Sequence, residues 1–476
     1  VNVSGKIPKL FFENYGDIFD HPLVVFADFE TFQSPVVGKT RGDHTQVLAT
    51  MTGVASYGSF VCSSIPSIRS SGVIKRGTAD EFIIDMLKLG LRYRHFCLNP
   101  ALMIITETQE HYDDTAQQCY LCKMSKASLI QLAVDKEKVL AEKQEREPKK
   151  IEDYLFVADH DHVTGLFRGS ACRSCNTKAQ MPKQIPIYFH NLENFDSHEL
   201  VSAIVRLRAK PLITTDDGEL SDDDSDADDF HCHQRCDDEP VEKDNFETGG
   251  ITLDIARIAK MRFSILANST EKYMQILLGP IVFRDSFKFS SASLDNLIKS
   301  QRKTAPTLAK CFPILAAHHP FVQKFPGDAS LELILRKVPF AYTSMVDNSY
   351  FSMPAVLPKS AYDNDLAQEE CSEKDYELVK TVVQHFDIQN QGDYHDLYLW
   401  TDVLALADCL LSTRAGWRSH CGLDLLKSVT LPSASYQAML KMTRVHMELL
   451  CSCKGPGMEL MKALNNNIRG GVSCIF

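Results

Sequence analysis

Two cysteine pairs with the same spacing constrain the fold of this 476-residue chain more than any other feature of its sequence. Cys119 and Cys122 form the first pair, and Cys172 and Cys175 form the second. Each pair is typical of a turn that supplies two thiolates, and two such pairs complete the tetrahedral site that Zn²⁺ prefers. The alternative is four thiols placed by coincidence. We predict a structural zinc site here, with a surface helix over about 125–146 between the pairs.

A strongly acidic tract interrupts the chain and accounts for its net charge of −11. From Asp216 to Glu247 there are 15 Asp and Glu against 2 Lys and Arg, so this segment carries −13 and the rest of the chain +2. Such a composition buries too little apolar surface to offset the entropy of ordering, so residues 214–248 are predicted to be a disordered insert. The nearly neutral remainder neither favours nor excludes a nucleic-acid partner.

The remaining sequence is typical of an α/β protein inside the cell. The 15 Cys are an odd number and no export signal precedes them, which argues against a disulfide framework. No uncharged apolar run is long enough to suggest a membrane partner. Apolar periodicity predicts strands at 23–27 and 185–190, further strands within 251–278, and helices at 81–91, at 200–207 and within 377–411.

Three separated motifs contain acids suited to binding hard divalent cations. Asp28 and Glu30 follow an apolar strand, and the period of two puts both on one side of it. Asp196 stands between a predicted strand and a predicted helix, where helix capping is the simpler role. Tyr398 and Asp402 lie four residues apart on one helix face, an arrangement that is also common in purely structural helices.

In their order and context these motifs resemble the exonuclease motifs of protein-primed family-B DNA polymerases, especially those of Maverick or Polinton transposons, with viral and linear-plasmid relatives. The resemblance also includes Phe283-Arg284-Asp285, Ser293-Leu294-Asp295, the segment from Lys337 to Tyr342, and Arg469-Gly470-Gly471 near the end. It implies a ribonuclease-H-like 3′-5′ proofreading exonuclease. The polymerase motif Tyr-x-Asp-Thr-Asp does not occur, so the chain is expected to represent a portion of a longer product without the polymerising palm.

The resemblance further implies a two-metal site and a DNA-binding groove. Asp28, Glu30, Asp196 and Asp402 would hold two Mg²⁺ or Mn²⁺ ions, Tyr398 would orient the attacking water, and Lys337 would offset charge on the phosphate. The residues implied to contact the single-stranded 3′ end are Thr31, His190, Asn191, Phe195, Ser293, Leu294 and Tyr342. A terminal protein that primes synthesis is an implied partner, and the nucleus is the expected location for a eukaryotic transposon product.

The implied organisation is one exonuclease domain with two inserts. Its parts are expected at 1–105, 183–213 and 249–430, with a zinc-binding insert at 106–182, the acidic insert at 214–248, and the start of a polymerase domain at 431–476. The zinc insert is expected to have a treble-clef form.

A second nuclease motif precedes the second cysteine pair. The run from Asp159 to Gly165, followed by Arg168 and Asn176, resembles the ββα-metal element of recombination endonuclease VII. That resemblance implies His160 as general base, with Asp159, His162 and Asn176 near a catalytic Mg²⁺. The alternative is that these residues only brace the zinc module.

Three functions therefore remain open from the sequence. The first is a 3′-5′ exonuclease that depends on the four acids. The second is an endonuclease centred on His160 that cuts branched or nicked duplexes. The third is a non-catalytic, zinc-dependent DNA-binding remnant of a transposon.

Overall fold

The structure is a computed structural model that describes residues 9–36, 48–150, 155–209, 255–269, 272–363, 369–448, 459–460 and 463. The acidic segment 214–248 and the glycine pair after Arg469, both singled out in the sequence, lie outside these residues. The fold is mixed α/β, as predicted. None of the described helices combines the length and apolar character that a membrane crossing requires.

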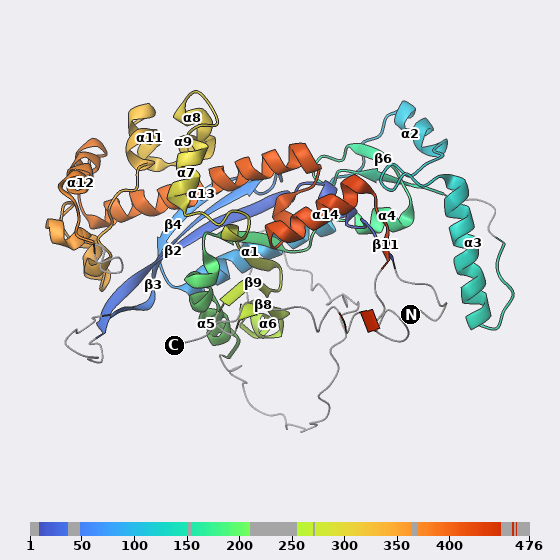
Figure 1. The fold of residues 1–476 in the computed structure, drawn as a ribbon, viewed down its shortest axis with the longest axis horizontal. Coiled ribbons are helices and arrows are strands. Elements are labelled where there is room, and N and C mark those ends of the chain that lie inside the picture. The colour runs from blue at the N-terminus through green and yellow to red at the C-terminus, as the bar shows by residue number, and fades with distance from the viewer. Residues whose placement is uncertain are drawn as a thin grey trace, which may run out of the picture.

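A seven-stranded mixed sheet forms the centre of the molecule (Figure 1). In spatial order its strands are β4 (Ser71–Arg76), β3 (Leu48–Ser63), β2 (Leu23–Val36), β7 (Ile185–Phe189), β10 (Ile281–Asp285), β9 (Lys272–Leu278) and β8 (Phe263–Ser269). Strands β2, β7 and β10 run parallel to one another, and the outer pairs are antiparallel. The parallel centre therefore brings together segments that are far apart in the sequence.

Alternating side chains of β2 enter two separate hydrophobic cores. Val24 and Phe26 belong to one core, whereas Val25 and Ala27 belong to the other, as the pleat of a strand requires. The strand does not end at the apolar run that predicted it but continues to Val36, with register shifts after Glu30 and after Phe32. Pairing with β3 carries the strand on through the charged residues, so the acids lie within the strand rather than at its end.

Helices cover both faces of the sheet. One face packs against α1 (Ala79–Leu98), α5 (Asp196–Ala209) and α6 (Ile255–Lys260). The other packs against the long helix α13 (Gln391–Cys421), with α7 (Leu294–Gln301), α8 (Leu308–Cys311), α9 (Pro313–His318), α10 (Pro320–Lys324), α11 (Asp328–Ile334) and α12 (Glu373–His385) around it. Figure 1 shows α13 lying along the sheet.

The position of α13 is fixed by its caps and by close packing on the sheet. Asn390 accepts a hydrogen bond from the backbone N–H of Asp393 at the start, and Gly422 ends the helix with a left-handed φ of 64°. A Cβ at Gly58 of β3 would lie 2.9 Å from Cγ2 of Val403, so only glycine allows this close approach. The packing places the first half of α13 directly over β2 and β3.

A small module lies between α1 and β7 in the sequence. It contains α2 (Glu107–Asp114), α3 (Lys126–Lys143), the antiparallel strands β5 (Val157–His160) and β6 (Phe167–Ala171), and α4 (Arg173–Lys178). Its hydrophobic core is separate from the two cores of the sheet and consists mainly of Cys119, Leu129, Ala171, Cys172 and Cys175. The helix predicted between the cysteine pairs is confirmed as α3.

The other described elements lie outside the sheet, the helices that cover it and the small module. They comprise η1 (Tyr15–Ile18), η2 (Leu192–Asn194), η3 (Ser286–Lys288), η4 (Tyr342–Ser344), η5 (Asn348–Ser352), η6 (Lys359–Tyr362), η7 (Leu425–Lys427), α14 (Leu431–Thr443), and the short pair β1 (Lys9–Leu10) and β11 (Met447–Glu448).

Candidate functional site

An acidic cluster forms where α13 crosses β2. Asp28 and Glu30 point to the same side of β2, and Asp402 comes from the facing turn of α13. One carboxylate oxygen from each of the three acids lies within 4.8 Å of the others. Asp196 is the first residue of α5, which follows the neighbouring strand β7, and its charge interacts with that of Asp28. The fold thus gathers acids from three distant parts of the sequence.

Burial makes these carboxylates hard to ionise without a counter-charge. Burial raises the pKa of Asp28 to about 7, although the backbone N–H of Phe29 donates to it at 3.0 Å. The pKa of Glu30, which is 7% exposed, is raised further by burial and then by the charges of Asp28, Asp402 and Asp196. Burial and Asp28 likewise raise the pKa of Asp402 well above its usual range.

The chemistry of the cluster fits divalent metal ions. No Lys or Arg in the described part of the chain forms an ion pair with any of the four acids. Glu30 is buried and the other three acids are half-buried, and the charge of Lys337 lowers the pKa of Asp402 without an ion pair. Crowded carboxylates without an ion-pair partner are costly, and hard cations such as Mg²⁺ and Mn²⁺ relieve that cost by accepting their oxygens as ligands. The set of Asp28, Glu30 and Asp402 therefore suits a hard divalent ion, whereas Asp196 lies outside this set, and a second ion stays a prediction.

We expect the metal-free protein to lose stability as the pH rises from about 4 to about 7. A carboxyl whose pKa is higher in the folded state holds its proton there after the unfolded chain has released it, so raising the pH favours unfolding. Melting temperatures in Mg²⁺-free and Mn²⁺-free buffer should fall across this range, and added Mn²⁺ should reverse the fall near pH 7. A melting temperature at neutral pH that does not respond to Mn²⁺ would contradict the metal assignment.

Two phenols and a cavity adjoin the acids. The hydroxyls of Tyr398 and Tyr342 lie 3.1 Å apart, and a hydrogen bond from Tyr398 opposes the rise in the pKa of Asp402. A cavity of about 230 Å³ opens beside them between α7, α13 and the segment after α11. Its lining includes Ser293, Leu294, Lys337, Tyr398 and Asp402, five residues predicted from the sequence.

The other predicted DNA-binding residues differ in how exposed they are and in how firmly hydrogen bonds hold them. Thr31 follows Glu30 at the first register shift of β2, and Phe195 and Tyr342 are 48% and 44% exposed. His190 is half-buried, and its Nδ1 lies 2.9 Å from the Ser286 hydroxyl while its Nε2 lies 3.0 Å from the Ala292 carbonyl oxygen. Both ring nitrogens of His190 are thus engaged, so its interactions brace the loop before α7.

The turn that carries Asn191 depends on an acid whose role the sequence did not indicate. Asn191 has a left-handed φ of 66°, a conformation that Asn tolerates better than most residues. Asp285, which is buried at the end of β10, accepts hydrogen bonds from the backbone N–H groups of Asn191 at 2.9 Å and Glu193 at 3.2 Å. Asp285 therefore fixes the turn that leads into Asp196.

A buried polar network lies one turn before Tyr398 on α13. His395 is 0% exposed, and its Nε2 lies 2.8 Å from the hydroxyl of Ser56, the residue paired with Glu30 across β2 and β3. The Nδ1 of His395 faces Arg76, which also forms a 2.6 Å ion pair with Asp396. No local sequence signal links Ser56 to His395, which explains why this support went unpredicted.

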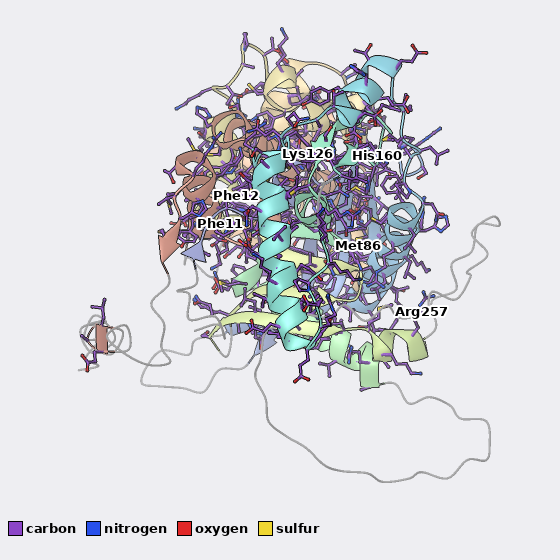
Figure 2. All side chains as sticks on the ribbon, turned by 90° about the vertical axis from the view of Figure 1, so that its right-hand side faces the viewer. Phe11, Phe12, Met86, Lys126, His160 and Arg257 are labelled. Carbon is purple, nitrogen blue, oxygen red and sulfur yellow. The ribbon has the colours of Figure 1, made fainter. Side chains whose placement is uncertain are left out.

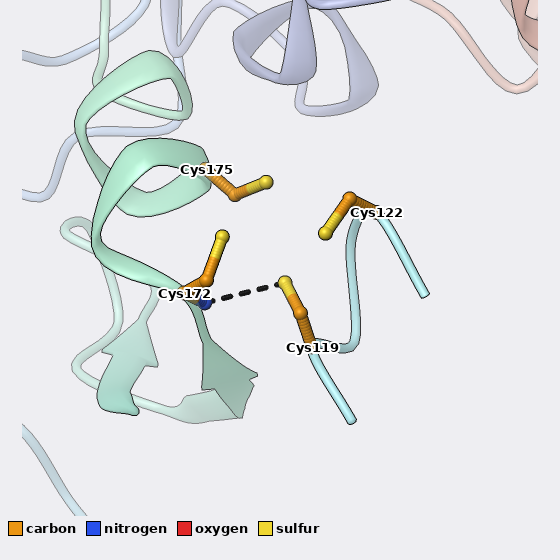
Figure 3. Close-up of side chains that lie close together, drawn as sticks. All are labelled: Cys119, Cys122, Cys172 and Cys175. Atoms are coloured by element: carbon orange, nitrogen blue, oxygen red, sulfur yellow. Dashed lines mark hydrogen bonds between the residues drawn. The ribbon is translucent and has the colours of Figure 1, made fainter. Parts of the chain in front are cut away.

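The four predicted zinc ligands come together in the small module (Figure 3). Their Sγ atoms all lie within 4.8 Å of one another, and the backbone N–H of Cys172 donates to Sγ of Cys119 at 3.2 Å. Hydrogen bonds from the other three thiols lower the pKa of Cys119. The set matches the Cys₄ geometry of structural zinc, in which sulfur atoms lie about 3.8 Å apart.

The second nuclease motif lies on the β5, β6 and α4 unit of the same module. Figure 2 views the molecule from the end that carries α3 and shows His160 on this side. The ring centroids of His160 and His162 lie 5.0 Å apart, and Asn176 lies on α4. Asp159 is 4% exposed. It accepts a hydrogen bond from the Tyr120 hydroxyl and forms a 2.8 Å ion pair with Arg168.

These contacts engage both carboxylate oxygens of Asp159. Among the described residues, the groups of acidic, histidine and cysteine side chains close enough to share a metal ion are the cysteine set and the Asp28, Glu30 and Asp402 set. The residues of the motif around His160 thus lie on one structural unit. Within the described residues they do not form a further group of side chains close enough to share a metal ion.

One known family matches part of this unit. Residues 141–196 match the family of recombination endonuclease VII, which confirms the resemblance seen around Asp159 and indicates a nuclease-like module that acts on DNA. No curated protein and no solved structure matches the chain. The match runs from the end of α3 through the sheet strand β7 to Asp196, the first residue of α5, and it does not include Asp28, Glu30 or Asp402.

Proposed function

We propose that the protein is a metal-dependent DNA nuclease and that its principal centre is the acidic cluster, which hydrolyses the 3′ ends of single-stranded DNA. The observation that carries this proposal is the meeting of Asp28, Glu30 and Asp402 within 4.8 Å, without an ion-pair partner among the described residues. Glu30 is buried and Asp28 and Asp402 are half-buried, so three unpaired acids this close together are more consistent with a functional site than with a structural role.

The residues around the cluster suit phosphodiester hydrolysis. When bound, two Mg²⁺ or Mn²⁺ ions would make a water more acidic and offset the charge of the departing 3′ oxygen. Burial and Asp402 hold the pKa of Tyr398 above its usual range, so its phenol stays protonated. Its single O–H interacts with Asp402 in the metal-free protein and would have to turn to the water in order to orient it. Lys337 lines the same cavity and supplies a positive charge for the phosphate.

We further propose that this centre belongs to a protein-primed family-B DNA polymerase with a ribonuclease-H-like exonuclease domain. The support is the motif order in the sequence, together with a cavity lined by Ser293, Leu294 and Lys337 beside the acids. In that assignment the centre proofreads newly made DNA, a terminal protein primes synthesis, and the product of a eukaryotic transposon acts in the nucleus.

A substrate panel tests the exonuclease. With Mg²⁺, the protein should shorten a 5′-labelled single-stranded oligonucleotide stepwise from its 3′ end. A terminal 3′ phosphorothioate linkage should slow digestion, and a circular single strand should stay intact, because the proposed groove accepts a free end. Cleavage of the circle without stepwise shortening of the linear strand would contradict the assignment.

The family match favours a second candidate, an endonuclease centred on His160. In this case a covalently closed, branched duplex should be cut, and the cutting should be lost in His160→Ala. His111→Ala is the matched control, since His111 is an exposed histidine on α2 of the same module. Retention of cutting in an acidic-cluster variant would separate the two centres, and equal cutting by both histidine variants would exclude His160.

A further inference from the structure

A second, larger cavity adjoins the cavity beside Asp402, and apart from Lys337 its lining has no role in the nuclease chemistry described above. It measures about 540 Å³ and lies between the segment after α11 and the first turns of α12. Arg336 and Lys337 line both this cavity and the smaller one beside Asp402. The two cavities therefore share a wall and form neighbouring sites on one surface.

The charges of the second cavity leave a cation available for a ligand. The lining has three cations, Arg336, Lys337 and Lys374, against two acids. Glu377 forms a 2.7 Å ion pair with Lys380, whereas Asp375 accepts a 2.7 Å hydrogen bond from Ser372 and keeps its negative charge. Lys374 also lines the cavity, and within the described part of the chain it forms neither an ion pair nor a side-chain hydrogen bond. An anion entering the cavity would thus meet Lys337 and Lys374 without displacing a partner of Lys374.

Helix stability does not explain Lys374. It is the second residue of α12, where the partial positive charge of the helix terminus disfavours a cation. The preceding Glu373 is the residue that suits this position, and its ion pair is with Lys359 rather than with Lys374. Lys374 is exposed and lines the cavity, so its ammonium group is accessible to a ligand there.

Resting on the proposed nuclease function, we propose that the second cavity binds a nucleotide phosphate through Lys374, next to the phosphate handled at the acidic cluster. Two sources have this chemistry, namely the adjacent phosphodiester of the bound strand and the nucleoside 5′-monophosphate released by hydrolysis. Because Arg336 and Lys337 line both cavities, their positive charges would attract a phosphate of either source at both sites.

Lys374→Ala and the charge reversal Lys374→Glu test the site, with Lys324→Ala as the control. Lys324 is an exposed lysine on α10 that lines neither cavity. Binding of a fluorescein-labelled oligothymidylate is measured by anisotropy without Mg²⁺ or Mn²⁺ across a series of salt concentrations. If the strand occupies the cavity, Lys374→Ala should weaken binding roughly three- to five-fold. The slope of the logarithm of the binding constant against the logarithm of the salt concentration should become shallower by about 0.7. Lys374→Glu should weaken binding more than Lys374→Ala.

A second arm identifies the source of the phosphate. If the released nucleotide occupies the cavity, strand binding should be unchanged, but inhibition of digestion by added thymidine 5′-monophosphate should weaken several-fold in Lys374→Ala. The site is disproved if the wild-type protein binds and digests DNA while both lysine variants match Lys324→Ala in both arms. A wild-type protein that neither binds nor digests single strands would instead disprove the proposed function.

Discussion

Asp402→Asn should reduce the rate of 3′-end digestion by at least about 10³-fold, the loss expected when about 4 kcal/mol of transition-state stabilisation by a metal site disappears. The carboxylate oxygens of Asp402, Asp28 and Glu30 lie within 4.8 Å of one another, so one amide in this set removes a ligand that the other two cannot replace. Initial rates with a labelled single strand at saturating Mg²⁺ give the comparison directly.

The same substitution should leave the protein folded, and its stability provides the check. Burial and the charge of Asp28 raise the pKa of Asp402, so neutralising this side chain removes repulsion from the metal-free state. The metal-free melting temperature should therefore rise slightly at pH 7, while the increase caused by Mn²⁺ should shrink. A large loss of rate together with unfolding would not count as support.

Asp408→Asn is the matched control on the same helix. Asp408 is a buried acid of α13 that accepts hydrogen bonds from the backbone N–H groups of Ile314 at 3.0 Å and Leu315 at 2.9 Å, and so caps α9. Its amide should lower the melting temperature but retain the rate of digestion. Equal rates for Asp402→Asn and wild type would exclude the acidic cluster as the catalytic centre.

Local pattern was sufficient to predict most of the elements that carry the cluster. The period of two put Asp28 and Glu30 on one side of a strand, and the structure has them on the side that faces α13. The predicted end of this strand was wrong. The apolar run stops at the acids, whereas the pairing of β2 with β3 continues to Val36. Strand length is set by the neighbouring strand, which the local sequence does not contain.

Interactions across the sequence could not be predicted in this way. The bond between Ser56 and His395 joins residues of β3 and α13, and the engagement of His190 by Ser286 and Ala292 depends on the parallel alignment of β7 and β10. Each requires the tertiary fold before a partner can be named. That the four acids bind catalytic metals, and that His160 acts as a base, stay predictions.

The cysteine module offers the clearest separation between structure and catalysis. Its small core contains three of the four cysteines, so the module has little apolar surface with which to fold unaided. Structural zinc contributes on the order of 10 kcal/mol or more to the folding of small domains. The sheet has two cores of its own, and neither of them includes these cysteines.

Cys172→Ser should therefore abolish stoichiometric zinc binding and make residues 106–182 sensitive to protease, while the sheet stays folded and 3′-end digestion continues. Metal analysis and limited proteolysis measure the first two effects, and Cys421→Ser, a partly exposed cysteine at the end of α13, is the control. Cutting of branched DNA, if His160 performs it, should be lost with the zinc, because Cys172 directly precedes α4, the helix that carries Asn176. Loss of 3′-end digestion in a protein whose sheet remains folded would show that the acidic cluster does not act independently of this module.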